Sequence, residues 1–147
     1  MKKYYLIGEK LSHSYSVDIH SLFGLNYELK ELSAEEVGDF LQKKDFDGLN
    51  VTIPYKKTVI PYLDEVNEIA KNIGAVNTIV NENGKLKGYN TDYFGLKYAL
   101  SFAGIEIKDK RVAVLGSGGA SLTAQKLAED TSAAEISVVS RNGELNY

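Results

Sequence analysis

Three residues whose side chains could bind a ligand or transfer a proton, Asn50, Thr52 and Lys56, lie near the end of an apolar run in the stretch GLNVTIPYKKTV, residues 48–59. The run has strand spacing and stops at Pro54. Amide and hydroxyl groups are costly in an apolar interior unless hydrogen bonds satisfy them. The polar side chains therefore either bond neighbouring backbone or face a ligand. Taken alone, the stretch favours the structural explanation.

Three further polar pairs stand where elements are expected to end. They are Ser14 and Ser16, Asn77 and Thr78, and Asn90 and Asp92. Each pair has an ordinary explanation, since such residues cap helices and occupy turns. Together with the first stretch they favour a functional site, because α/β folds build their sites at the ends of elements.

A glycine-rich turn, GSGGAS at 116–121, separates an apolar strand pattern from a helix pattern. Glycines there let the backbone turn tightly and approach a pyrophosphate, whose charge meets the helix N-terminus. Ser121 takes the third small position of the usual motif, and no G-K-[ST] ending marks a nucleoside-triphosphatase loop. The predicted cofactor-binding residues of the turn are Gly116, Ser117, Gly118, Gly119 and Ala120.

The residues after the next strand favour NADP over NAD. An enzyme that uses NAD usually offers Asp or Glu about 20 residues after the glycines, to hold the ribose hydroxyl. Here Ser140 and Arg141 stand in that place. A guanidinium forms charge-assisted, bidentate bonds to a 2′-phosphate. An ordinary solvated arginine is the alternative, and Glu144 beyond the strand end is a weak rival.

Strand and helix patterns alternate along the chain. Strands are predicted over 4–9, 26–32, 46–53, 111–116 and 135–141, a hairpin over 74–90, helices over 14–24, 33–44, 91–104 and 119–131, and helical turns around 55–63 and 65–73. Ser33 and Glu36 fit a capping box, and Asn83-Gly84 is a type I′ turn signal. The last helix is expected to bury Ala120, Ala124, Leu127 and Ala128, and the strand at 111–116 to be covered on both faces.

Composition narrows the class of protein. Of 147 residues, 44% are hydrophobic and 25% charged, as in ordinary globular proteins, and the net charge of −3 argues against nucleic acid as a partner. The absence of cysteine excludes disulfides and thiolate catalysis. No apolar stretch suits a membrane span, and Glu9 interrupts any signal-peptide core, so we expect a cytoplasmic protein. His13 and His20 have no third ligand at suitable spacing, so no metal site is expected.

The motifs SHSYS, NVTIPYK, GAVNT and GYNTDYFG, followed by GSGGAS and SRN, resemble the shikimate dehydrogenases in order and spacing. The resemblance spans residues 4–142, and the pair N-V-T-x-P-x-K and N-T-D-x-x-G is specific to this family and its quinate/shikimate relatives. It implies an α/β fold: a three-layer αβα substrate domain over 1–104, then the first βαβ unit of a Rossmann-type NADP-binding domain over 105–147.

The resemblance also implies substrate-binding roles. Ser14 and Ser16 would hydrogen-bond the shikimate carboxylate. Thr52 and Asn77 would bind ring hydroxyls, and Asn50 would support the site. Two departures from the family pattern, Val17 after the second serine and Ser21 after His20, affect the helix at 14–24 more than these hydroxyls.

For catalysis the resemblance implies an acid/base pair, Lys56 and Asp92, that interconverts 3-dehydroshikimate and shikimate with NADP. Oxidation of a secondary alcohol sends a hydride to the nicotinamide and a proton to a base. Lys56 would be that base, while Asp92 would also bind a ring hydroxyl and orient it beside the lysine. The polar residues at the strand end would then form the floor of a site.

The family's members are roughly twice this long, and a dinucleotide-binding domain has about six strands where this chain offers two after residue 110. We therefore expect an N-terminal fragment that folds and self-associates, binds shikimate weakly and does not turn over. Two alternatives stay open. One is a quinate/shikimate dehydrogenase, and the other is a non-catalytic module that binds a hydroxy acid or a partner chain.

Overall fold

The structure is a computed structural model that describes residues 2–12, 14–141, 143 and 145. His13, Asn142 and Glu144 lie outside the described residues. The chain divides into two compact units. Unit 1 comprises Met1–Lys71 and Val76–Asn90, and unit 2 comprises Asn72–Ala75 and Thr91–Tyr147. The predicted domain boundary between residues 104 and 105 stays a prediction, because compact units and functional domains need not divide at the same residue.

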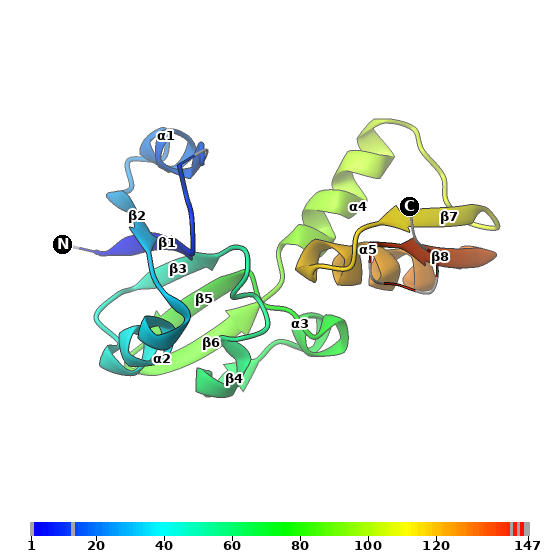
Figure 1. The fold of residues 1–147 in the computed structure, drawn as a ribbon. Helices are drawn as coiled ribbons and strands as arrows, with labels where there is room; N and C mark the ends of the chain where they lie inside the picture. Colours follow the sequence, from blue (N-terminus) through cyan, green and yellow to red (C-terminus); the bar gives the residue numbers. More distant parts are fainter. Residues whose placement is uncertain (1, 13, 142, 144, 146–147) are drawn as a thin grey trace. The chain divides into compact units, whose positions relative to one another are not determined.

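Unit 1 is built on a six-stranded mixed sheet of order β2-β1-β3-β5-β6-β4 (Figure 1). Its strands are β1 (Tyr4–Gly8), β2 (Tyr27–Glu31), β3 (Gly48–Val51), β4 (Glu65–Val66), β5 (Thr78–Glu82) and β6 (Lys85–Tyr89). β1 pairs in parallel with β2 and β3, and β5 runs antiparallel to β3 and β6. Since parallel β1 and β3 end at the same edge, the segments that follow them leave the sheet side by side.

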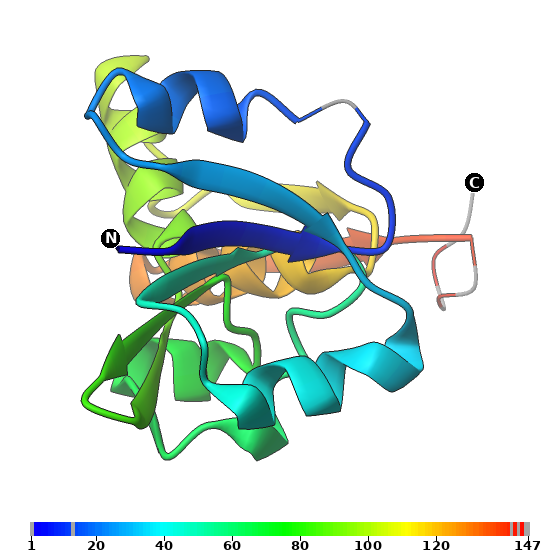
Figure 2. The same ribbon diagram turned by 90° about the vertical axis from the view of Figure 1, so that its left-hand side faces the viewer.

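Helices cover both faces of this sheet. α1 (Ser16–Ser21) packs against β2 on one face, and α2 (Ala34–Lys43) lies across the other (Figure 2). The core lies beneath α2, where Val37 and Leu41 pack with Leu49, Ile79 and other apolar strand residues. Two shorter elements are the 3₁₀ helix η1 (Ile60–Tyr62) and α3 (Glu68–Ile73), whose last two residues belong to unit 2. The predicted αβα layering is confirmed.

Local signals set the ends of these elements as predicted. α2 begins with a capping box, in which the Ser33 N–H donates to the Glu36 carboxylate at 2.8 Å. That backbone bond is the main cause that lowers the pKa of Glu36. Asn83 and Gly84 both have positive φ, 54° and 86°, as a type I′ turn between β5 and β6 requires.

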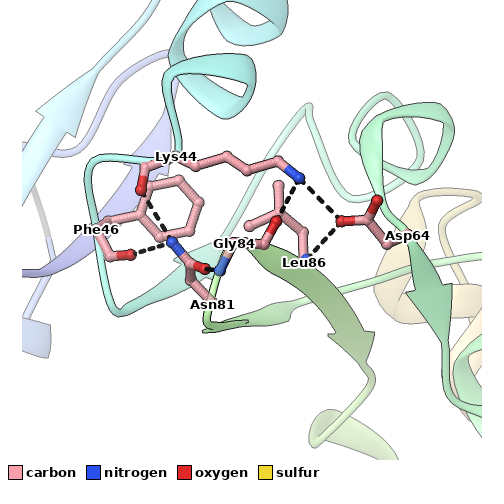
Figure 3. Close-up of polar contacts among 6 residues, drawn as sticks. All are labelled: Lys44, Phe46, Asp64, Asn81, Gly84 and Leu86. Carbon is pink, nitrogen blue, oxygen red and sulfur yellow. Dashed lines mark hydrogen bonds and ion pairs between the residues drawn. The ribbon is translucent and has the colours of Figure 1, made fainter.

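A clasp of polar contacts ties the end of α2 to the β5–β6 hairpin (Figure 3). The Asn81 Nδ2 donates to the carbonyls of Lys44 and Phe46 at 2.9 and 2.8 Å, and its Oδ1 accepts from the Gly84 N–H at 2.9 Å. The Lys44 ammonium donates to the Gly84 carbonyl and to Asp64 Oδ2, the latter at 3.0 Å. These contacts fix the turn of the β5–β6 hairpin to the end of α2.

Unit 2 contains α4 (Asp92–Phe102), β7 (Arg111–Leu115), α5 (Gly119–Asp130) and β8 (Glu135–Val139). β7 and β8 pair in parallel from Arg111 opposite Glu135 to Leu115 opposite Val139, with α5 as their crossover. The predicted βαβ unit is confirmed.

Several expectations about element ends and burial are wrong. The α-helical part of 14–24 is shorter, and its apolar residues Ile19, Leu22 and Phe23 are exposed. Residues 65–66 form strand β4 beside β6 instead of a helical turn, because the backbone of this segment finds partners in the sheet.

The inner face of α5 also differs from its predicted face. Ala120 is exposed, whereas Ser121 and Thr123 are buried together with Leu127 and Ala128, because packing on β7 and β8 decides which side of a small-residue helix faces inward. β7 is not covered on both faces either. Arg111, Ala113 and Leu115 on one face are exposed, whereas Val112 and Val114 on the other face are partly or fully buried.

Candidate functional site

Thr52 lies directly after β3, where its N–H donates to the Ile7 carbonyl of β1 at 2.9 Å. β1 ends at Gly8, and a Cβ at that position would lie 2.7 Å from Thr52 Cγ2 and 2.7 Å from Leu11 Cδ2. Contacts this short are essentially never tolerated, so glycine lets the two strand ends approach closely. The ends of β1 and β3 therefore hold Thr52 tightly at the sheet edge.

Lys56 follows in a turn that is anchored on both sides. Tyr55 and Val59 are buried, and the Tyr55 hydroxyl donates to the Leu32 carbonyl. The Lys56 carbonyl accepts from the Val76 N–H at 2.8 Å. These contacts fix the backbone of Lys56 and leave its side chain partly exposed at the end of the turn.

Asn50, Thr78 and Asn77 form one hydrogen-bonded chain. Asn50 Nδ2 donates to Thr78 Oγ1 at 3.3 Å, and the Thr78 hydroxyl donates to Asn77 Oδ1 at 3.0 Å. The backbone of Asn77 is held as well, since its carbonyl accepts from the Val51 N–H at 2.8 Å. The antiparallel register of β3 and β5 places Asn50 opposite Thr78, so the sheet brings these separate motifs together.

Ser14 and Ser16 lie at the start of α1. The Ser16 N–H donates to Ser14 Oγ at 3.2 Å, a local turn just before the helix, whose N-cap position is taken by Tyr15 without a side-chain cap. His20 Nδ1 donates to the Ser16 carbonyl at 2.7 Å, because a carbonyl can only accept. Both serine side chains are half-buried and two residues apart.

Tyr27 contacts residues of both groups, and sequence reasoning missed it. Its hydroxyl donates to Asn50 Oδ1 at 2.7 Å. Burial raises the pKa of Tyr27 to about 12, with the Ser16 side chain acting in the opposite direction. The ring stacks on His20 with centroids 3.9 Å apart. A lone tyrosine at the start of a strand carries no signal that distinguishes it from a core aromatic.

The predicted cofactor residues gather in unit 2 around the turn from β7 to α5. Gly116 has φ +110°, which favours glycine, and Cβ atoms added at Gly116 or Gly118 would meet no other atom within 4 Å. α5 starts after Gly118 with no side-chain cap. Ser140 is buried beyond the end of β8, and Arg141 beside it is exposed.

This arrangement fits a dinucleotide. The open glycine backbone leaves room for a pyrophosphate at the helix N-terminus, and the exposed guanidinium suits a 2′-phosphate. Ser117 is exposed on the same turn. Ala120, one residue further on, is exposed on the first turn of α5, although it was expected inside.

Asp92 is the first residue of α4 in unit 2. The next residue, Tyr93, is buried, and its hydroxyl donates to Asp130 Oδ2 at 2.8 Å. Asp130 also pairs with Lys126 at 2.6 Å. The start of α4 is thus anchored to the end of α5. The pairing of Asp92 with Lys56 stays a prediction.

Three further findings concern metal sites, buried polar groups and membrane spans. Among the described residues, no group of three or more potential ligands could hold a metal ion. Within the same residues every buried side-chain nitrogen or oxygen has a hydrogen-bond partner. No helix in the described part of the chain is both long and apolar enough to cross a membrane.

Comparison with known proteins decides the family. The family model described as the shikimate dehydrogenase substrate binding domain matches residues 6–79, which are 74 of the chain's 147 residues. The chain belongs to the shikimate dehydrogenase family. The resemblance drawn from the motifs is confirmed, and so is the α/β fold class.

Individual members of the shikimate dehydrogenase family align with almost the whole chain. The NADP(+) shikimate dehydrogenase of Halothermothrix orenii is 44% identical over 146 residues, which cover 92% of this chain and 50% of that protein. Among solved structures, shikimate dehydrogenase 1 of Peptoclostridium difficile has a TM-score of 0.91 at 37% identity, covering 100% of this chain and 60% of the other.

A third relative is the shikimate 5-dehydrogenase of Thermus thermophilus in complex with NADP(H) and shikimate. It matches with a TM-score of 0.86 at 33% identity, over 97% of this chain and 57% of that one. The chain spans about half the length of the curated relatives it matches.

Proposed function

We propose that this chain forms the substrate-binding half of an NADP-dependent shikimate dehydrogenase, which interconverts 3-dehydroshikimate and shikimate. The observation that carries the proposal is the hydrogen-bonded group at the sheet of unit 1, where Tyr27, Asn50, Thr78 and Asn77 are joined in series. Motifs far apart in the sequence thus meet in one place. The Thermus thermophilus relative, solved with shikimate and NADP(H), supports the same substrate.

The chemistry of these side chains suits shikimate, a carboxylic acid with ring hydroxyls. Ser14 and Ser16 offer hydroxyl donors to the carboxylate. Thr52 and Asn77 can both donate to and accept from ring hydroxyls. The tight packing of Thr52 against Gly8 and the buried position of Asn77 limit the motion of both groups, which favours binding in one orientation.

Lys56 acts as the acid/base in this proposal. It receives the proton of the substrate hydroxyl when the alcohol is oxidised and returns it when the ketone is reduced. Its anchored backbone holds the lysine side chain in the turn that follows β3. Asp92 would bind a ring hydroxyl and so orient the substrate beside the lysine.

NADP, when bound, supplies the hydride acceptor. In the proposal the backbone of Gly116, Gly118 and Gly119 would hold its pyrophosphate, with Ser117 and Ala120 on the same turn. Arg141 would bind the 2′-phosphate, and Ser140 would border it. Support comes from the positive φ of Gly116, the open space at Gly118 and the exposure of Arg141.

The proposal is tested by titrating the ¹⁵N-labelled chain with shikimate and following its amide resonances by NMR. We expect the resonances of Thr52, Lys56 and Asn77 to shift in a saturable manner, and quinate to produce smaller shifts. Thr52→Val should weaken binding, whereas Thr58→Val, an exposed threonine in the same turn, should not. A folded chain whose resonances stay unchanged in excess shikimate would contradict the proposal.

A further inference from the structure

We infer that Tyr27 is a positioning residue for the substrate, because its hydroxyl sets the first of three successive hydrogen bonds that lead to the hydroxyl-binding Asn77. The inference rests on the proposed function, since it assumes that Asn77 contacts shikimate. Tyr27 itself is the first residue of β2.

Tyr27 contacts two elements. Its hydroxyl donates its hydrogen to Asn50 Oδ1 of β3 at 2.7 Å, and its ring stacks on His20 of α1 with centroids 3.9 Å apart. The tyrosine therefore contacts both the strand that carries Asn50 and the helix that begins at Ser16.

The bonds beyond Asn50 run in one direction. Because Asn50 Oδ1 accepts from Tyr27, its amide nitrogen faces Thr78 and donates to the threonine oxygen. Thr78 then gives its only hydroxyl hydrogen to Asn77 Oδ1. The oxygen side of the Asn77 amide is thereby turned toward Thr78. The orientation of the Asn77 side chain, which is predicted to bind the substrate, is therefore set by Tyr27 through three successive hydrogen bonds.

The surroundings keep Tyr27 in this role. Its ring is 6% exposed and lies nearly parallel to the ring of His20, at 11°. His20 is held in turn by its bond to the Ser16 carbonyl. Burial raises the pKa of Tyr27 to about 12, so the hydroxyl keeps the hydrogen it donates throughout the neutral range.

Part of the network borders an open cavity of unit 1. Its volume is about 470 Å³, and its lining includes Tyr27, Asn50 and Thr78 together with His20. These three members of the network therefore lie at a surface, whereas Asn77 is buried. A tyrosine that served packing alone would need its ring but not its hydroxyl. Removal of the hydroxyl therefore distinguishes a packing role from a positioning role.

Tyr27→Phe removes the hydroxyl oxygen and keeps the ring that stacks on His20. We expect the Kd for shikimate, measured on the whole chain by NMR titration, to rise roughly two- to tenfold, as for the loss of a neutral hydrogen bond. The side-chain NH₂ resonances of Asn50 and Asn77 should move even without ligand. Tyr4→Phe is the matched control, because Tyr4 pairs with Tyr27 across the sheet and lines the same cavity.

Thr78 supplies a second test at the next step of the network. Thr78→Val keeps the side-chain shape but removes the hydroxyl, and should raise the Kd as Tyr27→Phe does, whereas Thr78→Ser should restore binding. The double variant should lose less affinity than the sum of the two single losses, because both changes interrupt the same chain of bonds.

The outcomes separate this inference from the proposed function. If the wild-type chain does not bind shikimate, the proposed function fails, while the amide resonances of Asn77 still report whether Tyr27 sets its rotation. If the wild-type chain binds shikimate and Tyr27→Phe binds it equally, with unmoved Asn77 resonances, the inference is overturned. Should Tyr27→Phe fail to fold, Thr78→Val with the Thr78→Ser rescue decides between the same outcomes.

Discussion

The two units of this chain bury their apolar side chains to different extents. In unit 1 the residues Val37, Leu41, Val59 and Ile79 are all 0% exposed, and the large apolar side chains that are most exposed there include Tyr15, Leu22 and Phe23 in and around α1. In unit 2 Val114, Leu127 and Ala128 are buried. Four large apolar side chains on its helix α4 and strand β7 stay 56–82% exposed, namely Phe94, Tyr98, Phe102 and Leu115.

This difference follows from the two sheets. Six strands with helices on both faces enclose a core, whereas the two-stranded sheet of β7 and β8 has one helix, α5, as its crossover. A packed core can hold polar groups in fixed positions, as the chain from Tyr27 to Asn77 shows. Unit 1 is therefore suited to orient a ligand, while unit 2 offers an open glycine turn and a helix start.

The largest expected effect tests whether the chemistry resides in unit 1. In a chimera that adds the part of the Halothermothrix orenii relative that this chain does not cover, Lys56→Ala should lower kcat by about 10²–10⁴-fold, the usual range for a general acid/base. Steady-state rates with shikimate and NADP measure it. Lys57→Ala, at the exposed neighbouring lysine, should have rates close to wild type. Normal turnover by Lys56→Ala would exclude it as the base.

A second comparison concerns stability and uses one leucine from each unit. Leu41→Ala should destabilise unit 1 by about 2–5 kcal/mol, because it leaves a cavity at a site that is 0% exposed. Leu115→Ala should change the stability of unit 2 by less than about 0.5 kcal/mol, because this side chain is 78% exposed. Urea unfolding followed by NMR signals from each unit measures both values. Equal losses of stability for the two variants would contradict the difference in packing between the units.

The third prediction concerns the cofactor residues of unit 2. In the same chimera, Arg141→Ala should weaken NADP binding by about 1.5–3 kcal/mol, as expected for lost hydrogen bonds to a charged group, and should weaken NAD binding much less. Isothermal titration with each cofactor gives the two affinities. Arg111→Ala, at the exposed start of β7, is the control. An equal loss of affinity for NADP and NAD would show that Arg141 does not bind the 2′-phosphate.

The smallest expected effects are on the stability of the two units at acidic pH. The pKa of Asp64 in unit 1 is lowered, first by the Leu86 N–H and then by Lys44. The pKa of Asp130 in unit 2 is lowered by Lys126 and then by Tyr93. Each carboxylate therefore stabilises its unit at pH values above the ordinary pKa of 3.8, and this contribution is lost as the pH falls through the lowered value.

Asparagine variants separate the two contributions. Asp64→Asn should flatten the acid dependence of stability for reporters in unit 1 only, and Asp130→Asn for reporters in unit 2 only. Hydrogen exchange of amides in β6 and in α5, measured between pH 3 and 6, distinguishes them. A change in both sets of reporters for one variant would show that the units do not respond separately.

Sequence reasoning succeeded where the signal is local. The capping box of Ser33 and Glu36, the turn at Asn83-Gly84 and the glycine turn at Gly116 each depend on backbone preferences within a few residues. The family motifs are local in the same sense, because each is a short run whose residue types can be read without knowing what lies opposite. These features were determined by the sequence by itself.

Tertiary structure decided which of these residues meet. Tyr27 reaches Asn50 across 23 positions and Asn50 reaches Thr78 across 28, through strand registers that no short pattern specifies. Neighbouring elements likewise decide that Ser121 is buried while Ala120 is exposed. They also decide which side of β7 is exposed. Burial and side-chain partners depend on packing between distant segments, so they emerge only when the whole sheet is assembled.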